Sequence, residues 1–262
     1  MKRSIDYTKI VRGVAWLALS ICFLGLCAAS VSNAESKKIN KVIYRLNHLT
    51  NGNDLITVEE IKKKILATYD LDLVGVEVDR IDLADVESIL QEEAFIVDTD
   101  AYVDAQEQLR IDISQRTPIL RVMDLSGNNY YVDAEGIQLP LSKHFTARVP
   151  IISGAVNDFY LNVDSTAGSI QEVFKIVKAA REDDFLLAWM EGIHVTNNQE
   201  ILLNGNLGKF DVIFGEAENI QEKFEKMKIF FESGLSVTGW NDIESINLKY
   251  ADQVVTKSRS KT

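Results

Sequence analysis

A run of 22 uncharged residues, from Gly13 to Ala34, constrains this chain more than any other feature of its sequence. As a helix it is about 33 Å long, close to the hydrocarbon thickness of a bilayer. It also lacks the polar stripe of a helix that packs on a soluble core. It therefore predicts a single transmembrane helix over 13–34. Residues 1–12 are then a short cytoplasmic tail, because large domains are translocated with little regard to charge.

Two other interpretations of this run remain open. Ser32-Asn33-Ala34 offers the small residues of a signal-peptide cleavage site, although the run is longer than a usual signal core. A lipoprotein anchor at Cys27 is disfavoured by Leu26, which stands where a small residue is expected. Cys22 and Cys27 are the two cysteines, so the chain beyond the run has no thiol for a disulfide, a zinc site or nucleophilic catalysis.

The charge balance excludes one broad class of partner. The whole chain carries a net charge of −11, and residues 35–262 alone carry 24 basic and 38 acidic side chains, a net charge of −14. Phosphate backbones repel such a domain, so nucleic-acid binding is disfavoured. With 46% hydrophobic residues, the chain is able to bury real cores.

Residues 38–115 show the order β-α-α-β-β. Val42, Tyr44 and Leu46 alternate as a strand does, and Thr57 with Glu60 reads as a capping box before a helix. A second helix follows a possible Asp82 cap. Two strands then cover Phe95–Asp104 and Gln108–Ser114. This order is the layout of a POTRA domain, and it also fits a generic α+β domain.

Residues 116–257 predict a second, β-rich domain with two helices. The helices are expected over Thr166–Arg181 and from Ile220 through Phe231 to a stop at Gly234. The strands are expected over Phe185–His194, Glu200–Asn204, 210–214 and 246–255. Residues 258–262 form a tail.

All three prolines fall within one stretch of this second part, among turn residues. The stretch contains Arg116 and Pro118, then the turn Tyr131–Gly136 with Asp133 at its centre, and finally Pro150–Gly154. These motifs, in this order, resemble the signature of the FtsQ/DivIB family of bacterial division proteins. Residue by residue, Arg116, Asp133 and Gly136 are expected to be architectural.

The C-terminal end carries the same resemblance, which extends over about residues 38–257. Trp240 precedes Ile246-Asn247-Leu248-Lys249-Tyr250 and then Gln253-Val254-Val255. The resemblance implies an α+β protein with a transmembrane helix, a POTRA-like domain and an elongated, mostly antiparallel β domain with flanking helices.

In that family the last strand is an exposed edge to which a strand of FtsB adds, in complex with FtsL. Carried over, the edge is Asn247–Val255, with Tyr250 as aromatic contact and Lys249 as a charge for a partner carboxylate, while the helix Phe224–Phe231 forms a neighbouring wall. Leu248 is expected in the core. The implied partner-binding residues are Asn247, Lys249, Tyr250, Ala251, Gln253, Val254, Val255 and Phe231.

Catalytic motifs are missing from the sequence. His48, His144 and His194 are not spaced as metal ligands, and no G-x-S-x-G, P-loop or Rossmann glycine pattern occurs. We therefore expect no cofactor, no metal, no small-molecule substrate and no enzyme activity. The implied role is a scaffold in the bacterial inner membrane at the division septum, with its bulk in the periplasm. A periplasmic POTRA-type chaperone or translocation factor is the alternative.

The anchor yields the first prediction. If 13–34 spans the membrane uncleaved, the protein resists carbonate extraction and keeps an N-terminal tag, because the apolar helix holds it in the bilayer. Membrane fractionation with immunoblotting checks this. A mature N-terminus at Glu35 contradicts it.

Overall fold

The computed structural model describes residues 16–23, 37–50, 52–70, 72–125, 127–156, 169–234 and 242–259. Residues 16–23 are helical, and the rest of the predicted membrane segment 13–34 lies outside the described residues. Among the helices that are described, none combines the length and the apolar character needed to cross a membrane.

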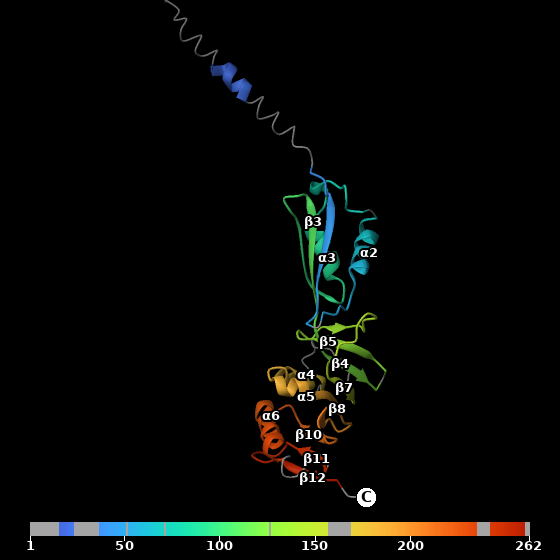
Figure 1. Cartoon of the computed structure of the whole chain (residues 1–262), viewed down its shortest axis with the longest axis vertical. Helices are drawn as coiled ribbons and strands as arrows, with labels where there is room; N and C mark the ends of the chain where they lie inside the picture. Colours follow the sequence, from blue (N-terminus) through green and yellow to red (C-terminus); the bar gives the residue numbers. More distant parts are fainter. Residues whose placement is uncertain are drawn as a thin grey trace, which may run out of the picture.

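A three-stranded sheet with two helices forms the N-terminal unit (Figure 1). Its elements are β1 (Lys41–Asn47), α2 (Val58–Tyr69), a 3-10 turn (Val78–Arg80), α3 (Leu83–Gln91), β2 (Ile96–Val103) and β3 (Gln108–Gln115). β3 is central, parallel to β1 and antiparallel to β2. The predicted β-α-α-β-β order is confirmed.

Both helices of this unit begin where the sequence predicts. The Thr57 side chain accepts from the Glu60 backbone N–H and Glu60 accepts from the Thr57 N–H, which completes the capping box. The Asp82 side chain accepts from the first-turn amides of α3. The core lies between these helices and one face of the sheet, and it includes Ile61, Ile65, Val86, Leu90, Leu109, Ile111 and Ile113.

A nine-stranded sheet with three helices forms the C-terminal unit, with strand order β12-β11-β10-β9-β8-β7-β4-β5-β6. Its strands are β4 (Pro118–Asp124), β5 (Asn129–Asp133), β6 (Gln138–Leu139), β7 (Ile151–Gly154), β8 (Met190–Val195), β9 (Ile201–Gly205), β10 (Asp211–Gly215), β11 (Ile243–Asn247) and β12 (Val255–Ser258). Its helices are α4 (Ser169–Ala180), α5 (Asp184–Trp189) and α6 (Ile220–Ile229), the last continued by a π-helical turn over Phe230–Gly234. A second hydrophobic core joins these helices to the sheet.

This sheet is mixed. Five of its eight neighbouring pairs are antiparallel, and β4–β7, β7–β8 and β10–β11 are parallel. Two of the parallel pairs follow from helical crossovers, because α4 and α5 connect β7 to β8, and α6 connects β10 to β11. The α+β class is confirmed, and the share of parallel pairing is larger than the sequence suggested.

One predicted strand is partly wrong. The segment Phe185–His194 is helical up to Trp189 and extended only from Met190. Asp183 accounts for the difference, because its side chain caps the helix by accepting from the Phe185 and Leu186 amides. The apolar run from Phe185 to Met190 has no period that separates a buried helix from a strand.

Two consecutive residues tie the two sheets together. The side-chain amide of Gln115, at the end of β3, donates to Asn47 O and accepts from Leu55 N at 2.7 Å. Arg116 then donates to the buried Asp133 carboxylate at 2.9 Å, and the other oxygen of Asp133 accepts from Glu135 N and Ile137 N. The architectural role expected of Arg116 and Asp133 is confirmed.

The segment after β6 makes a second connection back to the N-terminal unit. Ser142 Oγ donates to Leu55 O at 2.6 Å. Lys143 Nζ lies 2.5 Å from one oxygen of Glu60, and His144 Nε2 lies 2.8 Å from the other. The hydrogen bond from Lys143, with those from Thr57 and His144, lowers the pKa of Glu60 to about 2. One carboxylate thus serves both the α2 cap and the contact between the two units.

Glu60 therefore contributes to stability in a defined pH window. Its pKa is lower in the folded chain than its usual 4.5, so its contribution is complete above about pH 4.5 and is lost as pH falls toward about 2. We expect Glu60→Gln to lower the melting temperature at pH 7, with the difference from wild type vanishing near pH 2. Scanning calorimetry between pH 2 and 7 measures this.

The matched control is Glu59→Gln, which removes a charge from the adjacent, exposed position of the same helical turn. A destabilisation by Glu60→Gln that stays constant over the whole pH range contradicts the assignment.

Candidate partner-binding surface

The predicted docking segment Asn247–Val255 is not one strand. Asn247 ends β11 and pairs with both Ile213 of β10 and Val255 of β12. Lys249, Tyr250 and Ala251 lie in the turn that follows, Gln253 and Val254 lead out of it, and Val255 opens β12. The prediction of a continuous strand is wrong.

Two local features turn the chain back. The Asn247 side chain accepts from the Lys249 N–H at 3.0 Å, and Asp252 has a left-handed backbone with φ +57°. Leu248 is fully buried, as the sequence analysis expected, whereas the side chain of Tyr250 is 48% exposed. The alternation that suggests a single strand therefore ends at Leu248.

The sheet has two edge strands, β6 at one end and the exposed β12 at the other. Within the described part of the chain, β12 pairs with β11 alone. All four of its residues, Val255 to Ser258, are exposed. Of these four residues, only Val255 belongs to the docking segment predicted from the sequence. The short polar run Thr256-Lys257-Ser258 carries too little hydrophobic alternation to indicate a strand.

Three contacts hold the turn before β12 against the domain. Lys226 of α6 donates to the Tyr250 carbonyl oxygen at 2.8 Å, and Leu248 N donates to Ile213 O at 3.0 Å. Lys249 Nζ lies 2.5 Å from the Glu200 carboxylate, whose hydrogen bond raises the pKa of Lys249. The charge of Lys249 thus has a partner within the chain.

The aliphatic part of the Lys249 side chain packs against Gly215, where a larger residue would clash with it. Gly215, at the end of β10, has φ +76°, and a Cβ there would lie 2.7 Å from Lys249 Cγ. The turn therefore sits directly on the backbone of β10.

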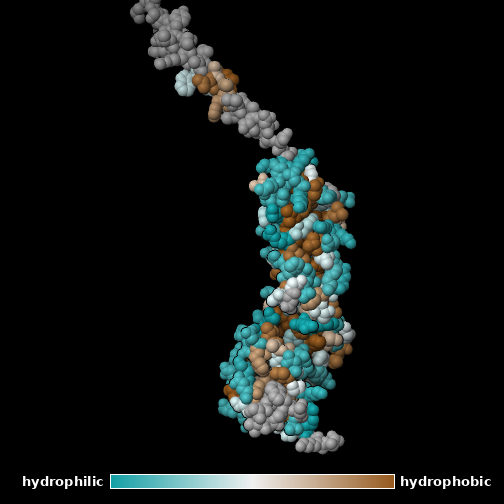
Figure 2. All heavy atoms as spheres, viewed as in Figure 1, coloured by the Kyte–Doolittle hydropathy of each residue, from teal (hydrophilic) through white to brown (hydrophobic). Residues whose placement is uncertain are grey.

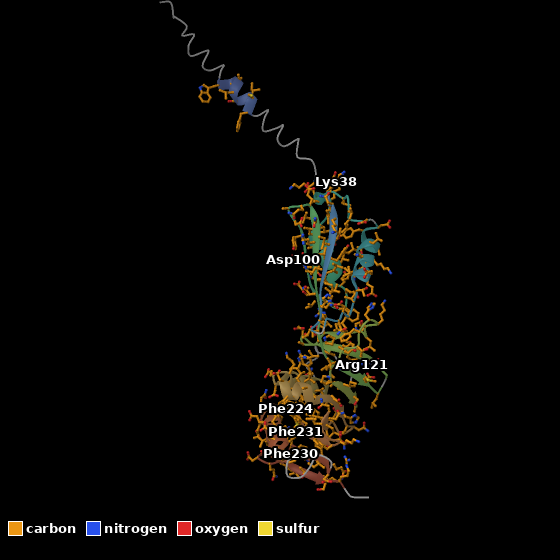
Figure 3. The ribbon with its side chains drawn as sticks, viewed as in Figure 1. Lys38, Asp100, Arg121, Phe224, Phe230 and Phe231 are labelled. Carbon is orange, nitrogen blue, oxygen red and sulfur yellow. The ribbon has the colours of Figure 1, made fainter. Side chains whose placement is uncertain are left out.

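Phe231 belongs to the interior more than to the surface. Its side chain is 7% exposed and makes edge-to-face contacts with Phe185, Trp189 and Phe210 at centroid distances of 5.5–5.9 Å. Figure 3 shows Phe224, Phe230 and Phe231 close together in the C-terminal unit. The structure separates Phe231 from the exposed residues of the turn with which the sequence analysis grouped it.

The described residues contain no candidate metal site, because no three His, Cys, Asp or Glu side chains lie close enough together to bind one ion. Each histidine instead has a local partner. His48 Nδ1 lies 2.8 Å from Asp54, His144 contacts Glu60, and His194 Nδ1 lies 3.1 Å from Ser153 Oγ.

Comparisons with known proteins agree with this architecture. Residues 117–257 match the family model described as FtsQ/DivIB, C-terminal related, and residues 49–114 match a POTRA-like domain. The cell division protein FtsQ of Salinibacter ruber is 26% identical over 159 residues, which cover 59% of this chain and 61% of that protein. The match thus spans about three fifths of the relative's length.

Fold and matches together define an α+β protein in which a POTRA-like domain precedes a mixed sheet with an exposed C-terminal edge. Since the first of these family models covers more than half of the residues, the chain belongs to the FtsQ/DivIB family of cell-division proteins.

The different burial of Phe231 and Tyr250 gives a direct test. Phe231→Ala removes a buried ring and should lower the free energy of unfolding by about 3–5 kcal/mol. Tyr250→Ala changes an exposed side chain and should stay within about 0.5 kcal/mol of wild type. Urea unfolding followed by circular dichroism measures both. Equal effects of the two substitutions contradict the placement of Phe231 in the core.

Proposed function

We propose that this chain is a non-enzymatic scaffold of the division complex, anchored in the cytoplasmic membrane, that binds FtsB-like and FtsL-like proteins at its C-terminal edge. The exposed edge strand β12 is the observation that carries the proposal. Among the described strands only β11 pairs with β12, which leaves the other side of its backbone open, and an added strand completes such an edge through main-chain hydrogen bonds.

The proposed organisation has five parts. A cytoplasmic tail (1–12) precedes a transmembrane helix (13–34), a POTRA-like domain (38–115) and a β domain (116–257), and residues 258–262 form a tail. The bulk of the chain then lies outside the cytoplasm at the septum, where it helps to recruit and regulate peptidoglycan synthesis. Membership of a cell-division family supports this role.

The side chains around the edge supply specificity in this proposal. Tyr250, in the turn before β12, is 48% exposed, and Val255, the first residue of β12, is 42% exposed. Lys249 has a side chain that is 43% exposed, so a partner carboxylate can reach it and compete with Glu200. The backbone of β12 provides affinity, and these three side chains select the partner.

Partner capture tests the edge. Full-length tagged protein, purified from membranes of cells that express its division partners, should retain an FtsB-like protein. Tyr250→Ala should reduce the capture about tenfold or more, because an aromatic side chain at an interface is a common hot spot. Lys249→Glu should also reduce it, with an effect that shrinks as salt rises.

A charge swap separates the two roles of Lys249, its ion pair with Glu200 and its proposed contact with a partner carboxylate. Lys249→Glu combined with Glu200→Lys restores the internal pair but presents the wrong sign at position 249, so capture should remain low. Glu200→Gln alone frees Lys249 and should leave capture intact. If folded Tyr250→Ala and Lys249→Glu proteins both capture as wild type does, the partner docks elsewhere.

A further inference from the structure

A hollow of about 670 Å³ lies on the C-terminal unit, and none of its described lining residues belongs to β12. It is bordered by the start of α5, by the loop after β9 and by the end of α6 with the π-helical turn. Figure 3 labels Phe231 in this part of the unit. The strand addition proposed at β12, with Lys249, Tyr250 and Val255, does not involve this hollow.

The apolar part of the hollow is made by Phe185, Leu207 and Phe231. Phe185 is 39% exposed and Leu207 is 43% exposed. The Phe185 ring stands edge-on to Phe231, with centroids 5.9 Å apart, so an aromatic floor continues from the core to the surface. Figure 2 shows that most of the visible surface of the two units is hydrophilic, with hydrophobic residues in limited patches.

The charged residues that line the hollow are mostly acidic. Its lining includes four carboxylates, those of Glu182, Asp183, Asp184 and Glu232, and one ammonium group, that of Lys228. Lys228 pairs with Asp183, and this pairing lowers the pKa of Asp183 and raises that of Lys228. Within the described residues, no salt bridge joins the other three carboxylates to a basic side chain of the chain.

An apolar floor with a rim of net charge −3 is suited to a ligand that is both apolar and positively charged. We propose that this hollow, formed by α5, the loop after β9 and the end of α6, binds a basic amphipathic segment of a partner protein. Apolar side chains of the segment cover Phe185 and Leu207, and its Lys or Arg side chains meet Glu182, Asp184 and Glu232. Lysine and arginine fit both parts, because their stems cover apolar surface and their charges pack well over aromatic rings.

The same rim argues against three other occupants. Anionic lipid headgroups and phosphate backbones are repelled by Glu182, Asp184 and Glu232, which form no salt bridge with another described residue. An acidic peptide meets the same repulsion. The sign of the rim therefore selects among partners of similar hydrophobicity, which is how like charges contribute to specificity.

This surface does not depend on strand addition at β12. Its lining residues come from other elements, and they exclude Tyr250 and Val255. A partner held at the hollow and a partner strand at β12 are separate contacts, so each is tested with the other intact.

The test uses full-length protein in zwitterionic nanodiscs, with empty nanodiscs as reference in surface plasmon resonance. The probe is an 18-residue helical peptide with leucine on one face and lysine on the other, and a second peptide carries glutamate in place of lysine. We expect the lysine peptide to bind and the glutamate peptide to bind at least tenfold more weakly. Raising the salt concentration should weaken the lysine peptide, as expected for an exposed charged rim.

Variants place the binding in the hollow. Glu182→Lys with Glu232→Lys should weaken the lysine peptide at least tenfold, and Leu207→Ser should weaken it several-fold. The matched control, Asp98→Lys with Asp100→Lys, makes the same change of charge at exposed positions of β2 and should change affinity less than twofold. Melting temperatures near that of wild type show that each variant is folded.

Three results would overturn the proposal: equal binding of the two peptides, wild-type affinity in the folded Glu182→Lys/Glu232→Lys protein, or an equal loss in the β2 control. Tyr250→Ala should leave peptide binding unchanged. A failure of strand addition at β12 is thereby distinguished from a failure of this site.

Discussion

The ion pair between Arg116 and Asp133 holds the second half of the molecule in place. Asp133 is fully buried, and besides the Arg116 guanidinium it accepts from the Glu135 and Ile137 amides, which flank Gly136 at φ +82°. One carboxylate therefore fixes both the entry into β4 and the turn after β5. Gln115, the residue before Arg116, bonds to the backbone of Asn47 and Leu55 in the N-terminal unit. Two neighbouring side chains therefore hold the two units at the point where the chain passes from one to the other. Loss of Asp133 would leave a guanidinium and two amides without an acceptor, a cost of several kcal/mol.

From this junction the sheet grows in one direction. The β4–β5 hairpin adds β6 on one side, and β7 on the other side begins the run that ends at β12. The helical crossovers turn two of the later pairings parallel and place α4, α5 and α6 against the core. The free edge lies at the far end of this run from the junction. Asp183 caps α5 at the border of the hollow, and the same side chain pairs with Lys228, which also lines the hollow.

Local signals in the sequence predicted much of the fold. Some features depend only on neighbours within a few residues, so the sequence alone predicts them. They are the helix caps at Thr57 and Asp82, the alternation in β3 and the turn around Asp133. Three features of the structure were not predicted from the sequence. The run from Phe185 to Met190 is apolar throughout, so its period carries no information. β12 is short and polar, and it is a strand only because β11 lies beside it. Phe231 was predicted to be a partner-binding residue in the wall beside the docking strand, but three aromatic rings from other elements enclose it. Each of these depends on tertiary contacts that a single sequence does not display.

In-cell photocrosslinking at Thr256 tests the central claim, that β12 is the docking edge, most directly. A photoreactive amino acid replaces Thr256 in the middle of β12, and a second protein carries it at Asp98 on the exposed face of β2 as a control. We expect an adduct with an FtsB-like division protein from Thr256 and none with that protein from Asp98. An absence of any such adduct at Thr256, in a full-length protein that supports division, would contradict it.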